Sequence, residues 1–245
     1  MPSKDDVSLN KLDERLLEIP TVFLPLTAEE TAGIQANMGL VDVEEPVMVA
    51  LAAKIDGIIE KEYPEGCFIK MVSRSPKDSY FGAKISLRCQ NGQEALNLLC
   101  DSERIWDDTY LYSPEFSCLA LRQWMDMSSM LEFRLFAKEG KLQGASQYFY
   151  RDFLDGLVEH KDYFWERIRE KFEEIKDYLP QDDLIVDMYW NGEEMVVIEC
   201  NPYDRDTDPC LFSWDSPIDG FKILEVPPEK VNWEEKCLEF FSPKA

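Results

Sequence analysis

Histidine is almost absent from this sequence, in which His160 is the single occurrence. Ser-His-Asp and Cys-His catalysis both need an imidazole that accepts a proton from the nucleophile, so either mechanism would depend on His160. That residue stands between Glu159 and Lys161 at the start of a helical pattern, where a surface position is expected. The sequence therefore gives little support to nucleophilic catalysis of these two kinds.

Basic residues are also few. Lys and Arg number 26 and Asp and Glu number 49, which gives a formal net charge of −23. A field of this sign repels polyanions, so non-specific binding to nucleic acid or to an anionic membrane is not expected. Any phosphate ligand has to be held by a local basic pocket or through a metal ion, which makes clusters of Lys and Arg informative.

The sequence has no Cys-x-x-Cys pair among its seven cysteines, and no apolar run approaches membrane-spanning length. Its first six residues are polar and do not resemble a signal peptide. We therefore expect a cytoplasmic protein whose cysteines are reduced and serve as small apolar side chains. With 245 residues, 45% of them hydrophobic, the chain is expected to form one large globular domain or two small ones.

Several segments have clear helix or core signals. Thr27 followed by Glu30 forms a capping box, which predicts a helix that starts there. A second helix is predicted from Glu45-Pro46 through Glu62, and a third from Gly92. In a fourth, apolar residues at helical spacing predict a face that packs on the core: Phe164, Ile168, Phe172 and Ile175.

Two short strands near the C-terminal end of the sequence predict a hairpin. Leu184 to Trp190 and Met195 to Cys200 are rich in large apolar and β-branched residues, and Asn191-Gly192 between them is a strong turn signal. Each strand contains a carboxylate, Asp187 in the first and Glu199 in the second.

The two carboxylates predict a metal site if they share a face of the hairpin. Because side chains alternate with a period of two, they share a face only if the connection holds an odd number of unpaired residues, such as Asn-Gly-Glu. Asn201 then lies on the side of Glu199. These hard oxygen ligands suit Mg²⁺ when phosphate oxygens and waters complete its octahedron. The alternative is a hairpin that displays charges on a solvated face.

A lysine and a basic loop predict an anion site. Cys67 to Val72 is expected to form a strand with Lys70 in an apolar setting, followed by the hydroxyl-rich loop Ser73 to Ser79. The lysine lies either on a solvated strand face or in a pocket that holds an anion. The loop contains Lys77 and can hold a phosphate, although it lacks the glycine spacing of a P-loop; the alternative is an ordinary polar turn.

Two further predicted strands contain arginines. Ser117 to Trp124 includes Arg122, and the strand from Met130 to Phe136 has Glu132 and Arg134 on one face. Either Arg134 and Glu132 form a surface ion pair of little energetic value, or Arg122 and Arg134 both point into a cleft. In a cleft, their planar guanidinium groups suit phosphate or ribose.

Taken in order, these motifs resemble the cell division cycle protein 123 family. The resemblance extends over nearly the whole chain, and each motif is short, but their order and spacing together are specific. The motifs are Phe68-Ile-Lys70, Ser75-Pro-Lys-Asp78, Leu121-Arg122-x-Trp124, Glu132-Phe-Arg134-x-Phe136, Gly144-x-Ser-Gln147, Asp187-x-Tyr, and Asn201-Pro-x-x-x-x-Thr-Asp208-x-x-x-Phe-x-Trp.

The resemblance implies an α+β fold of the ATP-grasp type, in which two lobes with antiparallel sheets clasp a nucleotide. We expect residues 1–245 to form a single ATP-grasp unit, with a smaller lobe at approximately residues 60–120 and a larger lobe that contains the hairpin 184–201.

The resemblance also implies ATP and Mg²⁺ as ligands. The residues that match phosphate contacts are Lys70, Ser75 and Lys77; those that match the hinge beside the adenine are Arg122, Gln123 and Trp124; those that match the lining of the nucleotide cleft are Glu132, Arg134 and Gln147. The residues that match the magnesium ligands are Asp187, Glu199 and Asn201.

Two functions follow from the resemblance. Eukaryotic members of the family help to assemble translation initiation factor 2 by binding its gamma subunit, so the first expectation is a Mg-ATP-binding assembly protein with that subunit as partner. The alternative is an ATP-grasp enzyme, an ATP-dependent ligase or phosphotransferase that modifies a protein, a peptide or RNA. The sequence supplies no evident nucleophile or acceptor site for it, and the net charge makes RNA the least favoured substrate.

Overall fold

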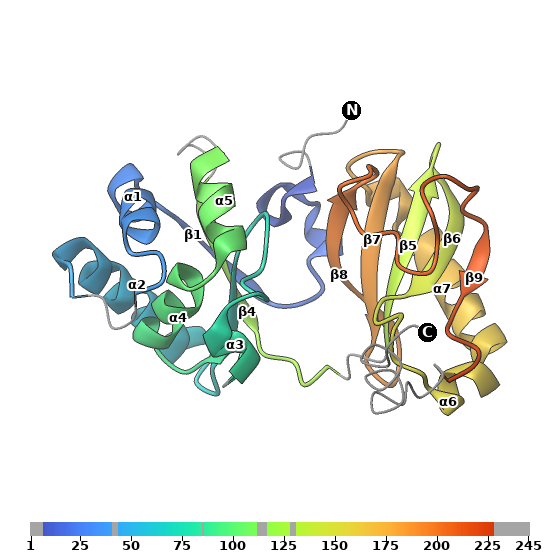
Figure 1. Cartoon of the computed structure of the whole chain (residues 1–245), viewed down its shortest axis with the longest axis horizontal. Coiled ribbons are helices and arrows are strands. Elements are labelled where there is room, and N and C mark those ends of the chain that lie inside the picture. The colour runs from blue at the N-terminus through green and yellow to red at the C-terminus, as the bar shows by residue number, and fades with distance from the viewer. Residues whose placement is uncertain (1–6, 41–43, 85, 112–116, 128–130, 228–245) are drawn as a thin grey trace, which may run out of the picture.

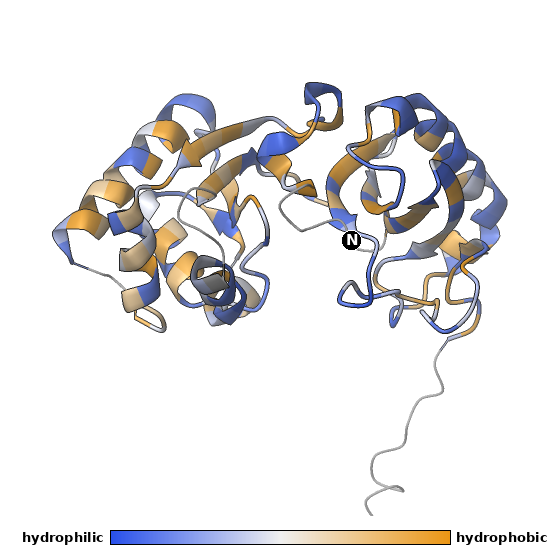
Figure 2. Cartoon of the chain, turned by 90° about the horizontal axis from the view of Figure 1, so that it is seen from above, coloured by the Kyte–Doolittle hydropathy of each residue, from blue (hydrophilic) through white to orange (hydrophobic). Residues whose placement is uncertain are grey.

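The computed structural model describes residues 7–40, 44–84, 86–111, 117–127 and 131–227. They form two lobes that lie side by side, each built on one sheet with helices against it (Figure 1). Hydrophobic residues concentrate on the strands of both lobes (Figure 2). The expected α+β class with two sheets is confirmed.

The first lobe has a four-stranded antiparallel sheet in the order β1-β4-β2-β3. Its strands are β1 (Thr21–Pro25), β2 (Cys67–Met71), β3 (Arg88–Cys89) and β4 (Cys118–Gln123). Its helices are α1 (Ala28–Ala36), α2 (Pro46–Glu62), α3 (Tyr80–Lys84), α4 (Gly92–Cys100) and α5 (Glu103–Leu111).

Three helices of this lobe begin where the sequence predicts. The backbone N–H of Glu30 donates to the side chain of Thr27, and the Glu30 carboxylate accepts from the backbone of Thr27, which completes the capping box of α1. α2 begins at Pro46, and Asn91 caps α4. Thr27 and Asn91 satisfy backbone N–H groups that a helix start leaves without a partner, and Pro46 has no N–H that needs one.

Strand alternation gives the first sheet two different faces. On one face, Ile69 and Leu121 pack in a core with apolar side chains of α2 and α4. The other face contains Phe68 and Lys70 from β2 and, directly opposite Phe68, Arg122 from β4. The period of two therefore places a lysine and an arginine on the face that is turned away from the helices.

The first lobe includes more of the chain than the sequence suggested. The expected start near residue 60 would exclude β1, α1 and most of α2 from this lobe. In the structure β1 is hydrogen-bonded to β4, and Ile34 of α1 and Leu51 of α2 lie in the core of the first sheet. We therefore propose residues 21–123 as the first lobe. The pairing of β1 with β4 joins segments far apart in the chain, which a local sequence pattern does not reveal.

The second lobe has a five-stranded sheet in the order β8-β7-β5-β6-β9. Its strands are β5 (Glu132–Lys138), β6 (Lys141–Gln147), β7 (Leu184–Trp190), β8 (Met195–Pro202) and β9 (Gly220–Lys222). Its helices are α6 (Asp155–Glu159) and α7 (Lys161–Ile175). All neighbouring strands are antiparallel except β6 and β9, which run parallel.

α7 covers one face of this sheet with the apolar residues that the sequence assigned to the core. Phe164, Ile168, Phe172 and Ile175 lie in one cluster with side chains of β5, β7 and β8. Burial of each of these side chains stabilises the fold by roughly 1.5–3 kcal/mol. The alternate residues of the same strands are left on the opposite face, where Glu132, Arg134, Asp187 and Glu199 are found.

The hairpin of β7 and β8 is confirmed, but its expected connection is wrong. Four residues, Asn191–Glu194, join the strands. With this even number of connecting residues and no irregularity in the strands, Asp187 would pair with Ile198. A β-bulge shifts the register by one residue, so that Asp187 pairs with Glu199 instead. The extra residue, Ile198, thus brings both carboxylates to one face, which the sequence analysis attributed to the turn.

The first described residues belong to the second lobe. Val7, Leu9, Leu12 and Leu16 lie in its core, and in Figure 1 this segment runs beside β8. Glu18 then accepts hydrogen bonds from Lys171 of α7 and from the backbone N–H of Val197. The chain therefore passes from the second lobe into the first before β1 and returns after β4.

Two expectations concern the chain as a whole. Within the ranges described above, no helix combines the length and apolar character needed to cross a membrane. Six cysteines fall in these ranges, and all of them are free thiols, five of them buried. Cys237 lies outside the described residues.

Candidate functional site

Two cavities lie between the lobes and share Ser75 and Glu199 as lining residues. The first, which we call the apolar cavity, has a volume of 360 Å³. Its apolar walls are formed by Ile19, Phe68, Leu87, Trp124, Met125, Met127, Phe149 and Ile198. The second, which we call the polar cavity, has a volume of 420 Å³ and is lined by Arg74, Arg104, Arg134, Tyr148, Asn201, Thr207 and Asp208 among others.

Most of the residues predicted from the sequence meet at these cavities. Those on the wall of the apolar cavity are Ser75, Lys77, Arg122, Gln123, Trp124, Glu132 and Glu199, and those on the wall of the polar cavity include Arg134 and Asn201. Lys70 and Asp187 are buried beside them and contact Glu199 and Arg134 respectively. The residues that were predicted as one site are therefore brought together from both lobes.

A row of paired side chains crosses the second sheet. Glu199, Asp187, Arg134 and Ser146 stand directly opposite one another on β8, β7, β5 and β6. Arg134 holds Asp187 with a two-pronged contact, Nε to Oδ1 at 2.8 Å and Nη2 to Oδ2 at 2.7 Å. Its third nitrogen, Nη1, donates to the backbone oxygen of Asp208 at 2.8 Å. The ion pair that the sequence left open between Arg134 and Glu132 is thus replaced by a buried pair with Asp187.

Lys70 links the two lobes. It extends from β2, is 1% exposed, and donates to the Oε2 atom of Glu199 on β8. Burial would raise the pKa of Glu199, but Lys70, Lys77 and Arg122 hold it at about 2. Burial lowers the pKa of Lys70. The Glu199 carboxylate opposes this shift, whereas the neighbouring cations increase it. Both shifts are those expected where cations outnumber carboxylates.

Arg122 is a buried cation with unused donors. It is 2% exposed, and its Nε and Nη2 atoms have no hydrogen-bond partner among the described residues. Burial lowers its pKa below the ordinary value. A buried donor without a partner costs about 1–3 kcal/mol. Because Arg122 lines the apolar cavity, its free nitrogens predict a hydrogen-bond acceptor on a ligand there.

Glu132 is a buried carboxyl on the wall of the same cavity. Burial raises its pKa to about 7; Lys77 and Arg134 oppose the shift, whereas Asp187 and Glu199 add to it. This carboxyl therefore changes charge near neutral pH.

We expect Glu132 to make the ligand-free protein less stable as pH rises toward neutral. The unfolded carboxyl ionises near 4.5 and the folded one at about 7, so the folded state binds more protons between these values. Relative to Glu132→Gln, which cannot ionise, the wild type should lose about 3 kcal/mol of unfolding free energy from about pH 4.5 to about pH 8. Urea denaturation of both proteins over this range measures the difference. A difference that does not change with pH would contradict the expectation.

Tyr148 was missed by the sequence analysis. The Arg134 guanidinium lies 4.7 Å and the Lys77 ammonium 5.1 Å from the centre of its ring, so the aromatic face contacts two cations of the site. Burial raises the pKa of Tyr148 to about 12. Its position directly after Gln147 at the end of β6 was the available signal in the sequence. An aromatic residue at the end of a strand is too common to indicate a functional site.

The loop that follows β2 is fixed to α5. Ser73 donates to the carboxylate of Asp108, and Arg74 pairs with the same group at 3.1 Å. Further along the loop, Asp78 accepts from the backbone N–H of Arg104 at the start of the helix. The loop residues between these two anchors are therefore held in place. α5 was not predicted from the sequence, and neither was the place of Arg104 at the polar cavity.

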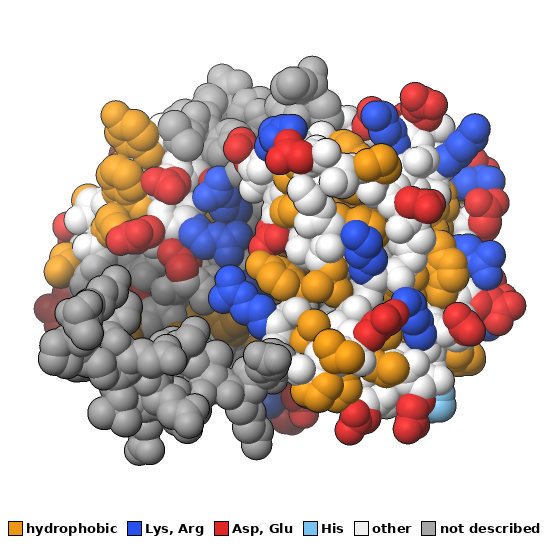
Figure 3. Space-filling model, turned by 45° about the vertical axis from the view of Figure 1, so that its right-hand side comes forward, with side chains coloured by type: hydrophobic (Ala, Val, Ile, Leu, Met, Phe, Trp, Pro, Cys, Tyr) orange, Lys and Arg blue, Asp and Glu red, His pale blue; other side chains and the backbone are white. Residues whose placement is uncertain are grey.

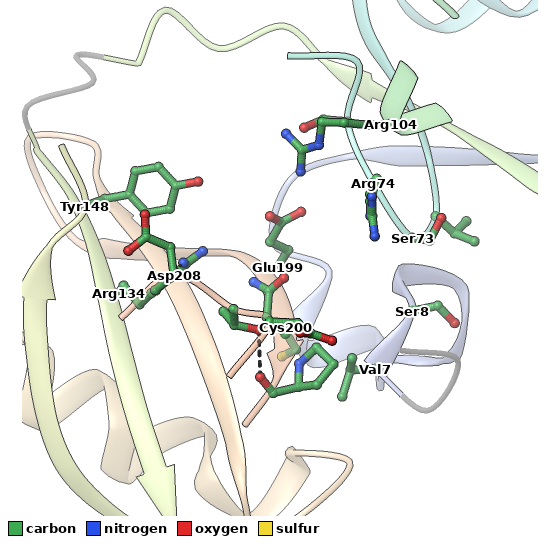
Figure 4. A pocket seen from close by; sticks show the side chains of 16 residues that line it. Val7, Ser8, Ser73, Arg74, Arg104, Arg134, Tyr148, Glu199, Cys200 and Asp208 are labelled. Carbon is green, nitrogen blue, oxygen red and sulfur yellow. Dashed lines mark hydrogen bonds between the residues drawn. The ribbon is translucent and has the colours of Figure 1, made fainter. Parts of the chain in front are cut away.

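The polar cavity is bounded by cations from both lobes. Figure 4 shows Arg74 and Arg104 on one side, Arg134 and Tyr148 on the other, and Glu199 between them. On the face shown in Figure 3, Lys and Arg side chains gather near the middle of the molecule. Three arginines and three carboxylates line this cavity, so cations are better represented there than in the whole chain, whose net charge is −23.

Gln147 lies beside the site without lining either cavity. Its amide nitrogen donates to the backbone oxygens of Phe149 and Asp152, at 2.7 and 2.5 Å. Its amide oxygen accepts from the backbone N–H of Leu224 at 3.0 Å. The side chain thus holds the turn after β6 and the segment after β9, and its expected contact with a nucleotide stays a prediction.

The donor set of the hairpin fits a magnesium ion. Asp187, Glu199 and Asn201 offer hard oxygens from adjacent strands, and Asn201 already donates to Asp187 at 3.0 Å. No group of three or more His, Cys, Asp and Glu side chains in the described residues is arranged to hold a metal by itself. A metal ion at this place would therefore need the amide of Asn201 and further oxygen ligands to complete its coordination shell.

The model of the D123 family matches residues 28–222. The translation initiation factor eIF2 assembly protein of Xenopus tropicalis is 30% identical over 186 residues, which cover 71% of this chain and 54% of the relative. Cell division cycle protein 123 of Candida glabrata is 38% identical over 111 residues, which cover 43% of this chain and 30% of the relative. The chain thus spans about half the length, or less, of these curated relatives.

A solved structure agrees with the fold. Cdc123 from Schizosaccharomyces pombe superposes with a TM-score of 0.78 at 20% sequence identity, over 91% of this chain and 98% of that chain. At this identity the likeness concerns the fold. The α+β fold expected from the sequence, with two lobes and one sheet in each, is confirmed.

Proposed function

Since the chain belongs to the D123 family, we propose that it binds Mg-ATP in the cleft between its lobes. The observation that carries this proposal is Arg122, whose two free nitrogens are buried at a cavity near Lys70 and Lys77. In a chain of net charge −23, cations that gather at one cavity indicate an anionic ligand. The apolar walls and the volume of 360 Å³ suit a purine base.

The two cavities support one arrangement of the nucleotide within this proposal. The base occupies the apolar cavity beside Phe68 and Trp124, and the phosphates extend past Ser75 and Glu199 toward the polar cavity. Along this path Lys77 and the other cations neutralise phosphate charge.

The hairpin supplies the metal ligands in this arrangement. Asp187, Glu199 and Asn201 would hold a Mg²⁺ ion, which would supply positive charge to neutralise the phosphates. The three side chains are positioned on adjacent strands of one sheet, so the metal side of the site is rigid.

A protein partner completes the proposal. The Xenopus tropicalis relative described above is named an assembly protein of translation initiation factor eIF2, and we propose that this chain likewise binds the gamma subunit of that factor. The nucleotide contacts both lobes, as does the ion pair of Lys70 and Glu199, so its presence fixes how the lobes are placed. Nucleotide occupancy then decides which surface the partner meets.

Two measurements on the wild type test this function. Calorimetry should show that ATP binds in the presence of Mg²⁺, and immobilised protein should retain the gamma subunit more strongly with Mg-ATP than without it. If ATP fails to bind with or without metal, the nucleotide part is wrong. If the subunit is retained equally in both conditions, nucleotide occupancy does not control the partner.

The polar cavity favours a second candidate function, an ATP-grasp enzyme. It provides 420 Å³ next to Glu199, and Arg74 and Arg104 on its wall suit the carboxylate of an acceptor molecule. An enzyme of this kind would release ADP or AMP only when a second substrate is present. Absence of release with amino acids, peptides and RNA would leave the assembly function as the better explanation.

A further inference from the structure

Asp187 already accepts three hydrogen bonds in the structure. It is 0% exposed, its two oxygens accept from Arg134 at 2.8 and 2.7 Å, and Oδ2 also accepts from Asn201 at 3.0 Å. Mg²⁺ requires near-ideal octahedral geometry and ligand oxygens at short range. A metal ion therefore competes with the guanidinium for the same oxygens.

Glu199 is bound in the same manner from the other lobe. Its Oε2 atom accepts from Lys70, which is 1% exposed. Breaking this pair without a replacement would leave a buried ammonium group unpaired, which is costly. A free metal ion cannot replace it, because metal and ammonium carry charge of the same sign.

The charges around the two carboxylates also oppose a free metal ion. Four cationic side chains act on them: Lys70, Lys77, Arg122 and Arg134. A third carboxyl, that of Glu132, interacts electrostatically with Asp187 and Glu199. The group therefore has one positive charge in excess when Glu132 is ionised and two when it is protonated, which repels a divalent cation and attracts a polyphosphate.

We propose that Arg134 and Lys70 occupy the metal carboxylates until a polyphosphate takes these two cations, so that metal and nucleotide bind together or not at all. The proposal rests on the Mg-ATP binding proposed above and adds its order and coupling. Phosphate oxygens accept hydrogen bonds from guanidinium and ammonium groups just as carboxylate oxygens do. When phosphate replaces the carboxylates as acceptor, Arg134 and Lys70 are therefore not left buried without a partner. Each ligand then raises the affinity for the other by the same factor.

Arg134→Met tests the exchange directly, because methionine fills the space but cannot bind Asp187. Binding of Mn²⁺ alone, in the absence of nucleotide, is followed by electron paramagnetic resonance. The affinity of the variant for Mn²⁺ should exceed that of the wild type by about tenfold or more. The wild type should show no specific Mn²⁺ site. The double variant Arg134→Met/Asp187→Asn should lose the gain, which would assign the new site to Asp187.

Arg15→Met is the matched control. Arg15 also binds an aspartate, Asp13, with a two-pronged contact, but on the exposed surface, so the change removes the same charge away from the cleft. It should leave Mn²⁺ binding as in the wild type. Since Arg134→Met leaves a buried carboxylate without its partner, Arg134→Lys provides a second variant that keeps the charge and loses the fork, with a smaller gain expected.

The outcomes separate this inference from the proposed function. Wild-type protein that binds Mn²⁺ alone as tightly as Arg134→Met does would overturn the exchange, even if calorimetry shows that Mg-ATP binds. Failure of ATP to bind the wild type with and without Mg²⁺ would overturn the proposed function and the exchange with it. Metal binding gained only in the Arg134 variants, together with Mg-ATP binding by the wild type, supports both.

Discussion

Replacing Asp187 by alanine should lower the free energy of unfolding by about 3–5 kcal/mol, because it leaves the Arg134 guanidinium buried without its partner. Arg134 is 6% exposed, and two of its three nitrogens donate to Asp187. Urea denaturation of the ligand-free proteins measures the loss. The same variant should also lose the metal dependence of ATP binding, since Asp187 is a proposed ligand.

Two comparisons show whether the loss comes from the buried pair. Asp215→Ala removes a carboxylate from an exposed pair with Arg205 and should change stability little. The double variant Asp187→Leu/Arg134→Met removes both charges and should recover most of the loss, because no unpaired charge remains buried. If Asp187→Ala costs no more than Asp215→Ala, the buried pair does not contribute as the structure indicates.

Replacing Lys70 by methionine should weaken the binding of Mg-ATP by about 100-fold. A hydrogen bond to a charged group contributes about 1.5–3 kcal/mol, and Lys70 is expected to form such a bond with a phosphate. Methionine keeps the length of the side chain, so packing beneath the cleft is largely preserved. Calorimetry with ATP and Mg²⁺ measures the change in affinity.

Lys54→Met controls for the loss of a positive charge. Lys54 belongs to the same lobe and pairs with Glu30 at 2.7 Å, but its side chain is half exposed and is not among the residues that line either cavity. Its replacement should leave ATP affinity within about twofold of the wild type. Equal losses in the two variants would mean that overall charge, and not the position of Lys70, governs binding.

The sequence predicted features that depend on neighbouring residues. The capping box of Thr27 and Glu30 and the apolar face of α7 are local patterns, and the structure has both. The shared face of Asp187 and Glu199 was also expected, but for the wrong reason. A β-bulge inserts one residue opposite a partner strand, and nothing in the order of residues near Ile198 indicates that insertion.

Features of the site that depend on distant contacts were harder to predict. Lys70 and Glu199 are 129 residues apart and meet only because the lobes face each other. The place of Arg104 at the polar cavity depends on the anchoring of α5 by Asp78. Gln147 was expected at the nucleotide, yet an amide can equally satisfy backbone groups, and its direction is decided by the turn that follows β6.

The N-terminal segment has a consequence for the order in which the protein folds during synthesis. Val7, Leu9, Leu12 and Leu16 pack with β5, β7 and α7, so they emerge from the ribosome long before their partners exist. The strands and helices from β1 to β4 form a continuous stretch and can close their core first. The second lobe, by contrast, needs both ends of the described chain and must close a loop of more than a hundred residues, which slows its completion. The cleft is therefore assembled last, when the newly made hairpin meets a lobe that is already formed.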